Sequence, residues 1–209
     1  MITWDHVLRT TPLIAILRGI EPHEAVEIAG ALYDAGFLCV EVPLNSPEPF
    51  ASLSAIKKAF DSKLLVGAGT VLTPEEVLRA KRAGAEMIIS PNVSEVVIAT
   101  AKTNGLTSIP GIMTPTEAMN AIRAGADALK LFPAEIIGSA GLRAMAAVLP
   151  KPALLLPVGG ITPEFMGAYV EAGAAGFGIG SALYSRGLRA DVVRKRAEVF
   201  VRASSRIFG

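Results

Sequence analysis

One pattern of apolar and polar positions recurs along the chain. A segment with helical spacing of apolar residues ends in Ala-Gly or Asn-Gly, and a short apolar run follows, as in DAGFLCVEV, RAGAEMIIS and RAGADALKLF. Glycine just past a helix end adopts the left-handed conformation that stops the helix, so each junction predicts a helix, a turn and a strand. Eight strands are expected, at residues 13–17, 37–42, 64–66, 86–90, 106–109, 128–132, 154–158 and 176–180.

Several segments between these strands open with a proline near the first helical turn, as in TPEEVLRAKRAG, TPTEAMNAIRAG and TPEFMGAYVEAG. A threonine before that proline fits an N-cap followed by proline at the first helical position. Eight alternations predict either a closed parallel barrel or a doubly wound open sheet. No G-x-G-x-x-G turn follows the first strand, and no linker rich in Pro, Gly or Ser divides the chain. We therefore expect an α/β fold, one (β/α)8 TIM barrel domain over residues 1–209 with short loops.

Composition narrows the class of protein. Apolar residues make up 51% of the chain, yet no uninterrupted apolar stretch approaches the roughly 18–20 residues of a membrane-spanning helix. The 20 basic and 19 acidic side chains give a net charge of +1, so neither nucleic acid nor a membrane surface is an expected partner. The N-terminus lacks a secretory signal pattern, and the one cysteine, Cys39, lies in an apolar run as a buried hydrophobe. These features predict a cytoplasmic protein.

Two charged side chains of the predicted strands can be placed inside the barrel. The leucines on either side of Lys130 suit the face covered by helices, which turns Lys130 into the barrel, and the same alternation turns Glu41 inward. Arg18 closes the first strand and Thr70 follows the third, at the C-terminal ends of strands where active sites of this fold lie. A Lys130–Glu41 ion pair that only stabilises the barrel is the alternative. Four polar groups that converge at one rim favour an active site.

These residue types suit one kind of chemistry. Burial disfavours an ammonium ion, so the pKa of Lys130 should be lowered, and a neutral amine can attack a ketone to form a Schiff base. The iminium then accepts the electrons of an adjacent C–C bond when that bond breaks. Glu41 is the strand carboxylate that we can place inside the barrel, and it can transfer protons. Arg18 offers a forked donor set for a carboxylate, and Thr70 adds a hydroxyl.

Glycine-containing turns follow the last two strands, with Gly159 and Gly160 in the first turn and Gly180 and Ser181 in the second. Those two loops form the recurrent phosphate site of this fold, and glycine lets backbone N–H groups approach an oxyanion. Tight turns without a ligand are the alternative for either pair alone. Glycines in both loops together favour a phosphate site.

Metal chemistry has little support in the sequence. The two histidines, His6 and His23, lie near the N-terminus without partners at a workable ligand spacing. A nucleophilic Ser or Cys with a histidine base is also unsupported. We therefore expect no metal ion and no other cofactor.

The motifs PLIAILRGI, VEVPLNSP, VGAGTVLTPEE, ALKLFPAE and PVGGITPE, in this order, resemble the 2-keto-3-deoxy-6-phosphogluconate and 6-phosphogalactonate aldolases over residues 12–184. The resemblance implies a homotrimeric class I aldolase that cleaves a phosphorylated 2-keto-3-deoxy sugar acid to pyruvate and glyceraldehyde 3-phosphate. It also implies roles for individual residues. Lys130 would form the Schiff base and Glu41 would be the general acid/base. Binding would fall to two groups, with the pyruvate carboxylate at Arg18 and Thr70 and the phosphate at Gly159, Gly160, Gly180 and Ser181.

Two segments bear on the substrate. EVPLNSP and PVGG look like the galactonate-type members, whereas LKLFPAE is closer to the gluconate type. Asn45 stands where the gluconate type has a carboxylate-binding Arg, and Val158 replaces a Thr beside the substrate hydroxyls. We therefore expect cleavage of 2-dehydro-3-deoxy-6-phosphogalactonate, with the gluconate epimer or 4-hydroxy-2-oxoglutarate as alternative substrates. A non-catalytic barrel that binds a phosphorylated ligand is the alternative from another class, and an isomerase that uses Glu41 alone is a third.

Overall fold

The computed structural model describes residues 2–209, in which parallel strands alternate with helices. The strands are β1 Leu13–Ile16, β2 Cys39–Pro43, β3 Leu65–Gly69, β4 Met87–Ile89, β5 Thr107–Ile109, β6 Gly111–Ile112, β7 Leu129–Leu131, β8 Leu155–Pro157 and β9 Phe177–Ile179. The helices are α1 Trp4–Thr10, α2 Pro22–Asp34, α3 Pro49–Phe60, α4 Pro74–Arg82, α5 Glu95–Thr103, α6 Pro115–Arg123, α7 Ala134–Val148, α8 Pro163–Glu171 and α9 Ala190–Phe208. No helix within residues 2–209 is long and apolar enough to cross a membrane.

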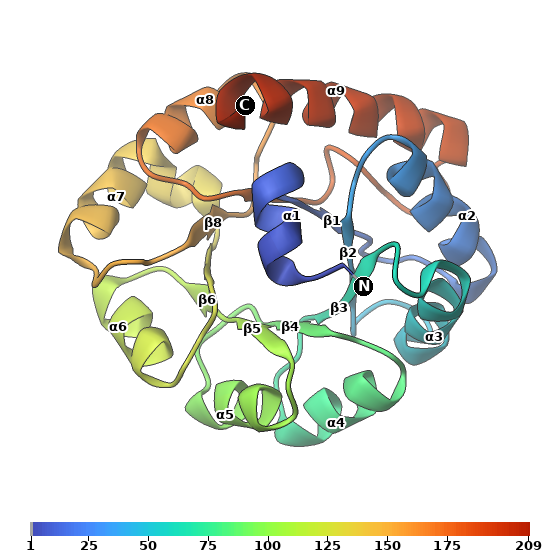
Figure 1. Ribbon diagram of the computed structural model, residues 1–209, viewed down its shortest axis with the longest axis horizontal. Helices are drawn as coiled ribbons and strands as arrows, with labels where there is room; N and C mark the ends of the chain where they lie inside the picture. Colours follow the sequence, from blue (N-terminus) through green and yellow to red (C-terminus); the bar gives the residue numbers. More distant parts are fainter. Residues whose placement is uncertain (1) are drawn as a thin grey trace.

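The strands form a closed barrel, with α2 to α9 arranged around it (Figure 1). One run of paired strands has the order β5-β4-β3-β2-β1-β9, and the second has the order β6-β7-β8. Two isolated bridges connect the two runs. Leu155 in β8 pairs with Ala174, which precedes β9, and Val158, which follows β8, pairs with Gly178 in β9. The predicted barrel is therefore confirmed, and the doubly wound alternative is wrong.

Seven of the eight predicted strands match the structure to within two residues at each end, whereas the third does not, and one further strand was not predicted. The predicted fifth strand is followed at once by a separate short strand, β6, because Pro110 lies between them and has no N–H to donate to a ladder. The predicted third strand, residues 64–66, ends too early, since β3 continues through Gly67 and Ala68 to Gly69. Glycines inside a strand are easily mistaken for a loop, but here they mark close approaches of other side chains.

Alternation along the strands separates two apolar cores, as predicted. The outer core lies between strands and helices and includes Val40, Val42, Leu129 and Leu131. The inner core fills the barrel with side chains of the opposite parity, which are Ile14, Cys39, Leu65, Met87, Ile89, Ile109, Ala128 and Leu156. Lys130 shares the parity of Ala128, and Glu41 that of Cys39, so both charged side chains occupy the inner face.

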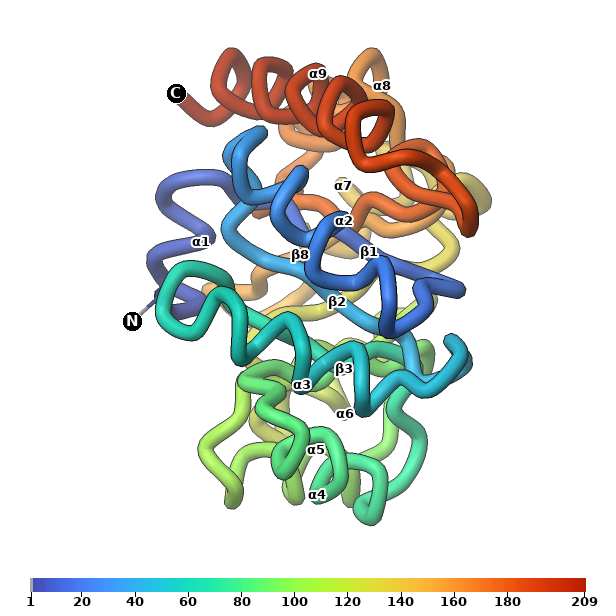
Figure 2. Tube along the Cα trace, turned by 90° about the vertical axis from the view of Figure 1, so that its right-hand side faces the viewer, coloured from blue at the N-terminus to red at the C-terminus, as the bar shows by residue number. Residues whose placement is uncertain are grey.

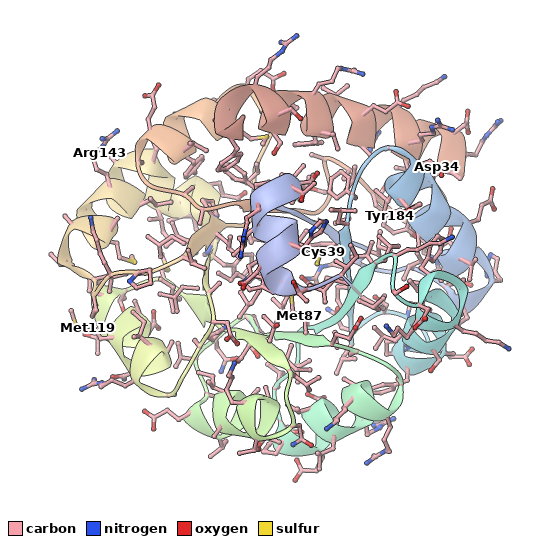
Figure 3. All side chains as sticks on the ribbon, viewed as in Figure 1. Asp34, Cys39, Met87, Met119, Arg143 and Tyr184 are labelled. Carbon is pink, nitrogen blue, oxygen red and sulfur yellow. The ribbon has the colours of Figure 1, made fainter. Side chains whose placement is uncertain are left out.

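Helix α1, which the sequence pattern did not predict, covers the N-terminal end of the barrel. Trp4 and Val7 from this helix are buried in the inner core. Figure 1 shows α1 across the centre of the barrel, and Figure 2 shows it at one end of the molecule. In Figure 3, Cys39 and Met87 lie close to α1 near the barrel axis. The helix therefore closes one end of the barrel and leaves the other end for loops.

We expect the α1 contact to contribute substantially to stability. Replacing the buried Trp4 by Ala should lower the free energy of unfolding by about 3 kcal/mol, because it removes a large side chain from the inner core and leaves a cavity. Urea unfolding measures this change. The matched control is Phe165→Ala, at a position 60% exposed, where a change below about 0.5 kcal/mol is expected. Equal effects of the two substitutions would contradict the assigned role of α1.

Candidate active site

A pocket of about 820 Å³ opens at the C-terminal ends of the strands, opposite α1. Its lining includes eight of the nine residues that the sequence singled out, which are Arg18, Thr70, Lys130, Val158, Gly159, Gly160, Gly180 and Ser181. The ninth, Glu41, lines a small cavity inside the barrel that also touches Lys130, Val158 and Gly178. The structure therefore brings all nine residues to one end of the barrel.

Lys130 lies on the inner face of β7 and is only 3% exposed. Its Nζ is 4.9 Å from the centroid of the Phe132 ring. Burial lowers the pKa of Lys130 below its ordinary value of 10.5, while Glu41 opposes the change and Arg18 adds to it. A larger fraction of this amine is therefore neutral near pH 7 than for an exposed lysine, and the neutral amine is the nucleophilic form.

Glu41 lies on the inner face of β2 and is 1% exposed. Its Oε1 has no hydrogen-bond partner. Burial raises the pKa of the Glu41 carboxyl, while Lys130 and then Arg18 lower it. A carboxyl group with a raised pKa holds a proton more readily near neutral pH, and it can both give and take one during a reaction.

The Glu41 carboxylate packs against the backbone of β3 at Gly69. A side chain at this position would overlap the carboxylate, because a Cβ there would collide with Glu41 Oε1. Gly69 is extended, so its φ does not require glycine. The requirement comes from the carboxylate beside it, and Gly69 therefore makes room for Glu41.

The alternative of a purely structural ion pair is not supported by the geometry. Among residues 2–209, no Lys130 nitrogen lies within 4.0 Å of a Glu41 oxygen. A buried pair that stabilises a fold needs close contact and satisfied lone pairs to offset the loss of hydration. Here the two charged groups share a cavity without contact, and Glu41 keeps an unpartnered oxygen. The close contact that a structural ion pair requires is therefore absent.

Arg18 stands at the exposed mouth of the pocket, just beyond β1. Its Nη1 donates a hydrogen bond of 2.9 Å to Asn45 Oδ1. The next residue, Gly19, donates its backbone N–H to Ser46 Oγ at 3.0 Å. The loop after β2 thus holds both the guanidinium and the backbone next to it, and the remaining donors of the guanidinium can bind an anion.

The glycine turn after β8 adopts conformations that other residues rarely take. Gly159 has φ 105° and Gly160 has φ 66°. A side chain at position 160 would also collide with Glu135, at the start of α7. Glycine is therefore required here for both reasons, and the backbone of this turn faces the pocket without a Cβ in the way.

The second loop, after β9, is held by a residue that the sequence analysis missed. Tyr184 lines the pocket, is buried, and donates a hydrogen bond of 2.7 Å from its hydroxyl to Glu24 Oε1 in α2. An ion pair between Arg186 and Glu21 is a second contact that holds the same loop. The partner of Tyr184 is 160 residues away in the sequence, so no local pattern signals this contact.

Eight other lining residues were not singled out as site residues, and Phe132, Pro91, Thr162 and Ser185 are among them. The alternation along its strand places Phe132 inside the barrel with Lys130, but assigns it no role. Pro91, Thr162 and Ser185 depend on how loops fold over the rim. No group of three or more His, Cys, Asp or Glu side chains within the described residues is placed to hold a metal ion.

Comparison with known proteins gives a consistent result. The family described as "Aldolase: KDPG and KHG aldolase" matches residues 4–197. A curated relative from Escherichia coli (strain K12), "2-dehydro-3-deoxy-6-phosphogalactonate aldolase", is 47% identical over 192 residues, covering 92% of this chain and 94% of the relative. A solved structure described as "Native KDPGal structure" superimposes with a TM-score of 0.92 at 46% identity, covering 94% and 95% of the two chains.

A more distant solved structure carries chemical information. It is the KDPG aldolase from Legionella pneumophila, described as having "pyruvate captured at low pH as a covalent carbinolamine intermediate". It aligns with a TM-score of 0.80 at 26% identity and covers 99% of this chain and 98% of its own. The similarity therefore extends over essentially the whole barrel.

Burial of the Lys130 ammonium is unfavourable, so the substitution Lys130→Met should raise the free energy of unfolding, by an amount that depends on pH. Below the folded-state pKa, the folded protein must bury a charge that the unfolded chain keeps in water. Methionine at this position should therefore raise the free energy of unfolding at pH 7 by on the order of 1 kcal/mol. The gain should shrink as the pH rises through the lowered pKa of Lys130 toward 10.5, because the amine is then neutral in both states.

Urea unfolding at several pH values between 7 and 10 measures this gain. The control is Lys151→Met, since Lys151 is exposed and its substitution should cause little change at any pH. A Lys130→Met variant that is less stable than the parent at pH 7 would contradict the assignment. So would a gain that does not vary with pH.

Proposed function

The chain belongs to the KDPG and KHG aldolase family and is a carbon–carbon lyase, and from this premise we propose that Lys130 is its Schiff-base residue and 2-dehydro-3-deoxy-6-phosphogalactonate its substrate. The products would be pyruvate and glyceraldehyde 3-phosphate, and the reaction is reversible. One observation carries the proposal. A desolvated amine and a desolvated carboxyl share the barrel interior without forming an ion pair, directly below a pocket that is open at the C-terminal rim.

The reaction follows from the positions of these two groups. The neutral Lys130 Nζ adds to the C2 ketone, and loss of water from the resulting carbinolamine leaves an iminium ion. Glu41 accepts the proton of the C4 hydroxyl as the C3–C4 bond breaks, the aldehyde forms at C4, and the bond electrons move to C3 and the iminium to give an enamine. Glu41 returns a proton to C3. Water then hydrolyses the iminium, which releases pyruvate and restores the amine.

The two ends of the substrate match two parts of the pocket. Arg18 and Thr70 would hold the carboxylate next to the reacting ketone, since a guanidinium and a hydroxyl are suitable donors for it. The turns at Gly159–Gly160 and Gly180–Ser181 would hold the phosphate through their backbone N–H groups. Lys130 lines the same pocket as both sets, as a substrate that spans them requires.

The choice between the two C4 epimers rests on Val158 and on the relatives. Val158 is nearly buried and lines both the pocket and the inner cavity, so it lies next to the carbons that react. The similar protein from Escherichia coli (strain K12) is described as a galactonate-type aldolase. The gluconate-type and 4-hydroxy-2-oxoglutarate aldolases are the second candidate. The binding barrel without catalysis and the isomerase that uses Glu41 alone have no support from the family.

The resemblance also implies a homotrimer and a cytoplasmic location. Both stay predictions.

Borohydride reduction in the presence of pyruvate tests the nucleophile. We expect a reduced three-carbon adduct on Lys130, identified by peptide mass spectrometry, because the imine is the species that borohydride traps. The Lys130→Met variant should give no adduct. Lys57 and Lys151 serve as internal controls, since Lys57 forms an ion pair with Glu86 and Lys151 lies at the surface. An adduct on either of them in place of Lys130, or none at all, would refute the assignment.

Substitution of Val158 by Thr tests the substrate. A threonine is nearly the same size and adds a hydroxyl that can bond the hydroxyl of one epimer. We expect the ratio of kcat/KM for the galactonate over the gluconate epimer to fall by about tenfold, which corresponds to one hydrogen bond. Val158→Ala is the matched control, because it removes bulk without adding a polar group. An unchanged ratio in the Thr variant would count against the galactonate assignment.

A further inference from the structure

Thr70 has a backbone conformation that its residue type disfavours. Its φ is 56°, in the left-handed region, where a β-branched side chain crowds its own backbone. Glycine would adopt this conformation without strain, and the flanking sequence already contains glycines at 67 and 69. A strained residue that lines a pocket indicates that its side chain is used there.

Such a conformation persists only if the neighbouring backbone is held in place. The residues on both sides of Thr70 are held by hydrogen bonds. On one side, the carbonyl of Gly69 accepts a hydrogen bond of 2.7 Å from the Leu44 N–H. On the other side, the Val71 N–H donates to the carbonyl of Ile89 at 3.2 Å. These two bonds join the backbone of the turn to the residue that follows β2 and to β4.

The Val71 carbonyl is held by a side chain. Ser90, the residue after β4, donates its hydroxyl to this oxygen at 2.7 Å. Ser90 is 3% exposed and Val71 is fully buried, so water cannot replace the bond. Val71, the residue that follows Thr70, is therefore fixed through its N–H by the Ile89 carbonyl and through its own carbonyl by Ser90.

Ser90 itself does not line the pocket, whereas its neighbour Pro91 does. Ser90 therefore has no direct contact with the ligand-binding surface. It is connected to Thr70 through the backbone of Val71. Loss of its hydroxyl would leave a buried carbonyl without a partner and would release one of the constraints that oppose relaxation of Thr70.

We propose that Ser90 is a positioning residue for the keto acid carboxylate, because it holds Thr70 in the strained conformation that presents the threonine hydroxyl to the pocket. This inference rests on the proposed function, in which Thr70 binds that carboxylate. Ser90 makes no contact with substrate and takes no part in bond breaking. Its effect should therefore appear in the binding of pyruvate and leave the reactivity of Lys130 unchanged.

Borohydride trapping at increasing pyruvate concentrations separates these two effects. For Ser90→Ala we expect the half-saturating pyruvate concentration to rise about tenfold, the change that a buried hydrogen bond commonly makes. The extent of Lys130 labelling at saturating pyruvate should stay as in the parent. Ser90→Thr, which keeps the hydroxyl, should restore most of the affinity. Ser90→Cys, close in size but a poor donor, should behave like Ser90→Ala.

A double-mutant cycle tests whether Ser90 acts through Thr70. In a Thr70→Gly background the side chain and the strain are both absent, so Ser90→Ala should no longer change the half-saturating concentration. Ser52→Ala is the matched control for removal of a buried serine hydroxyl. Ser52 is fully buried in α3, its hydroxyl has no hydrogen-bond partner, and it lies outside the pocket. This control should leave pyruvate binding unchanged.

The outcomes distinguish failure of the inference from failure of the proposed function. If the parent protein gives no adduct on Lys130, the proposed function is wrong. If the parent is labelled and Ser90→Ala binds pyruvate equally well, Ser90 is not a positioning residue. An effect of Ser90→Ala that persists unchanged in the Thr70→Gly background would also overturn the inference. Should Ser90→Ala unfold, the Cys and Thr variants give the same comparison.

Discussion

The structure depends on one constraint, the burial of an amine and a carboxyl in one narrow apolar interior without direct contact between them. Contact would make the pair an inert ion bridge, and full separation would leave two costly isolated charges. Lys130 and Glu41 lie between these limits. Burial shifts both pKa values in the direction of the neutral forms, and the residual attraction between the two groups opposes the shift. Each group is therefore neutral more readily than it would be in water.

Several features around this pair follow from the same constraint. Gly69 has no side chain because the Glu41 carboxylate occupies the space beside it. Thr70, the next residue, keeps a strained φ and is held by hydrogen bonds on both sides. Asn45 orients the Arg18 guanidinium at the mouth of the pocket. Each of these features either lowers the stability of the fold or restricts which residue can stand at that position. Each also places one group against the pocket, as is typical of a preorganised site.

Much of this arrangement could be predicted from the sequence because it depends on local periodicity. Glycine after each helix marked the start of most strands, and the alternation along β2 and β7 placed Glu41 and Lys130 inside the barrel. What escaped prediction depends on distant contacts. Helix α1 is short, and its role arises from packing against the inner core rather than from its own sequence pattern. The bond between Tyr184 and Glu24 joins opposite ends of the chain. The strain at Thr70 becomes visible only when its φ is known.

Helix α1 has a consequence for chemistry as well as for stability. Trp4 and Val7 complete the inner core at the end of the barrel opposite the pocket, so apolar side chains such as Cys39 and Met87 lie below the reacting groups. Burial, and then the nearby Glu41 and Glu86 carboxylates, also raise the pKa of the Cys39 thiol. Without the helix, water could reach Glu41 from below and reduce the desolvation that shifts its pKa. The closed end leaves the pocket as the open route to Lys130. In the reaction that we propose, the substrate and the water that hydrolyses the imine would therefore enter from the same side, past Arg18 and the glycine turns.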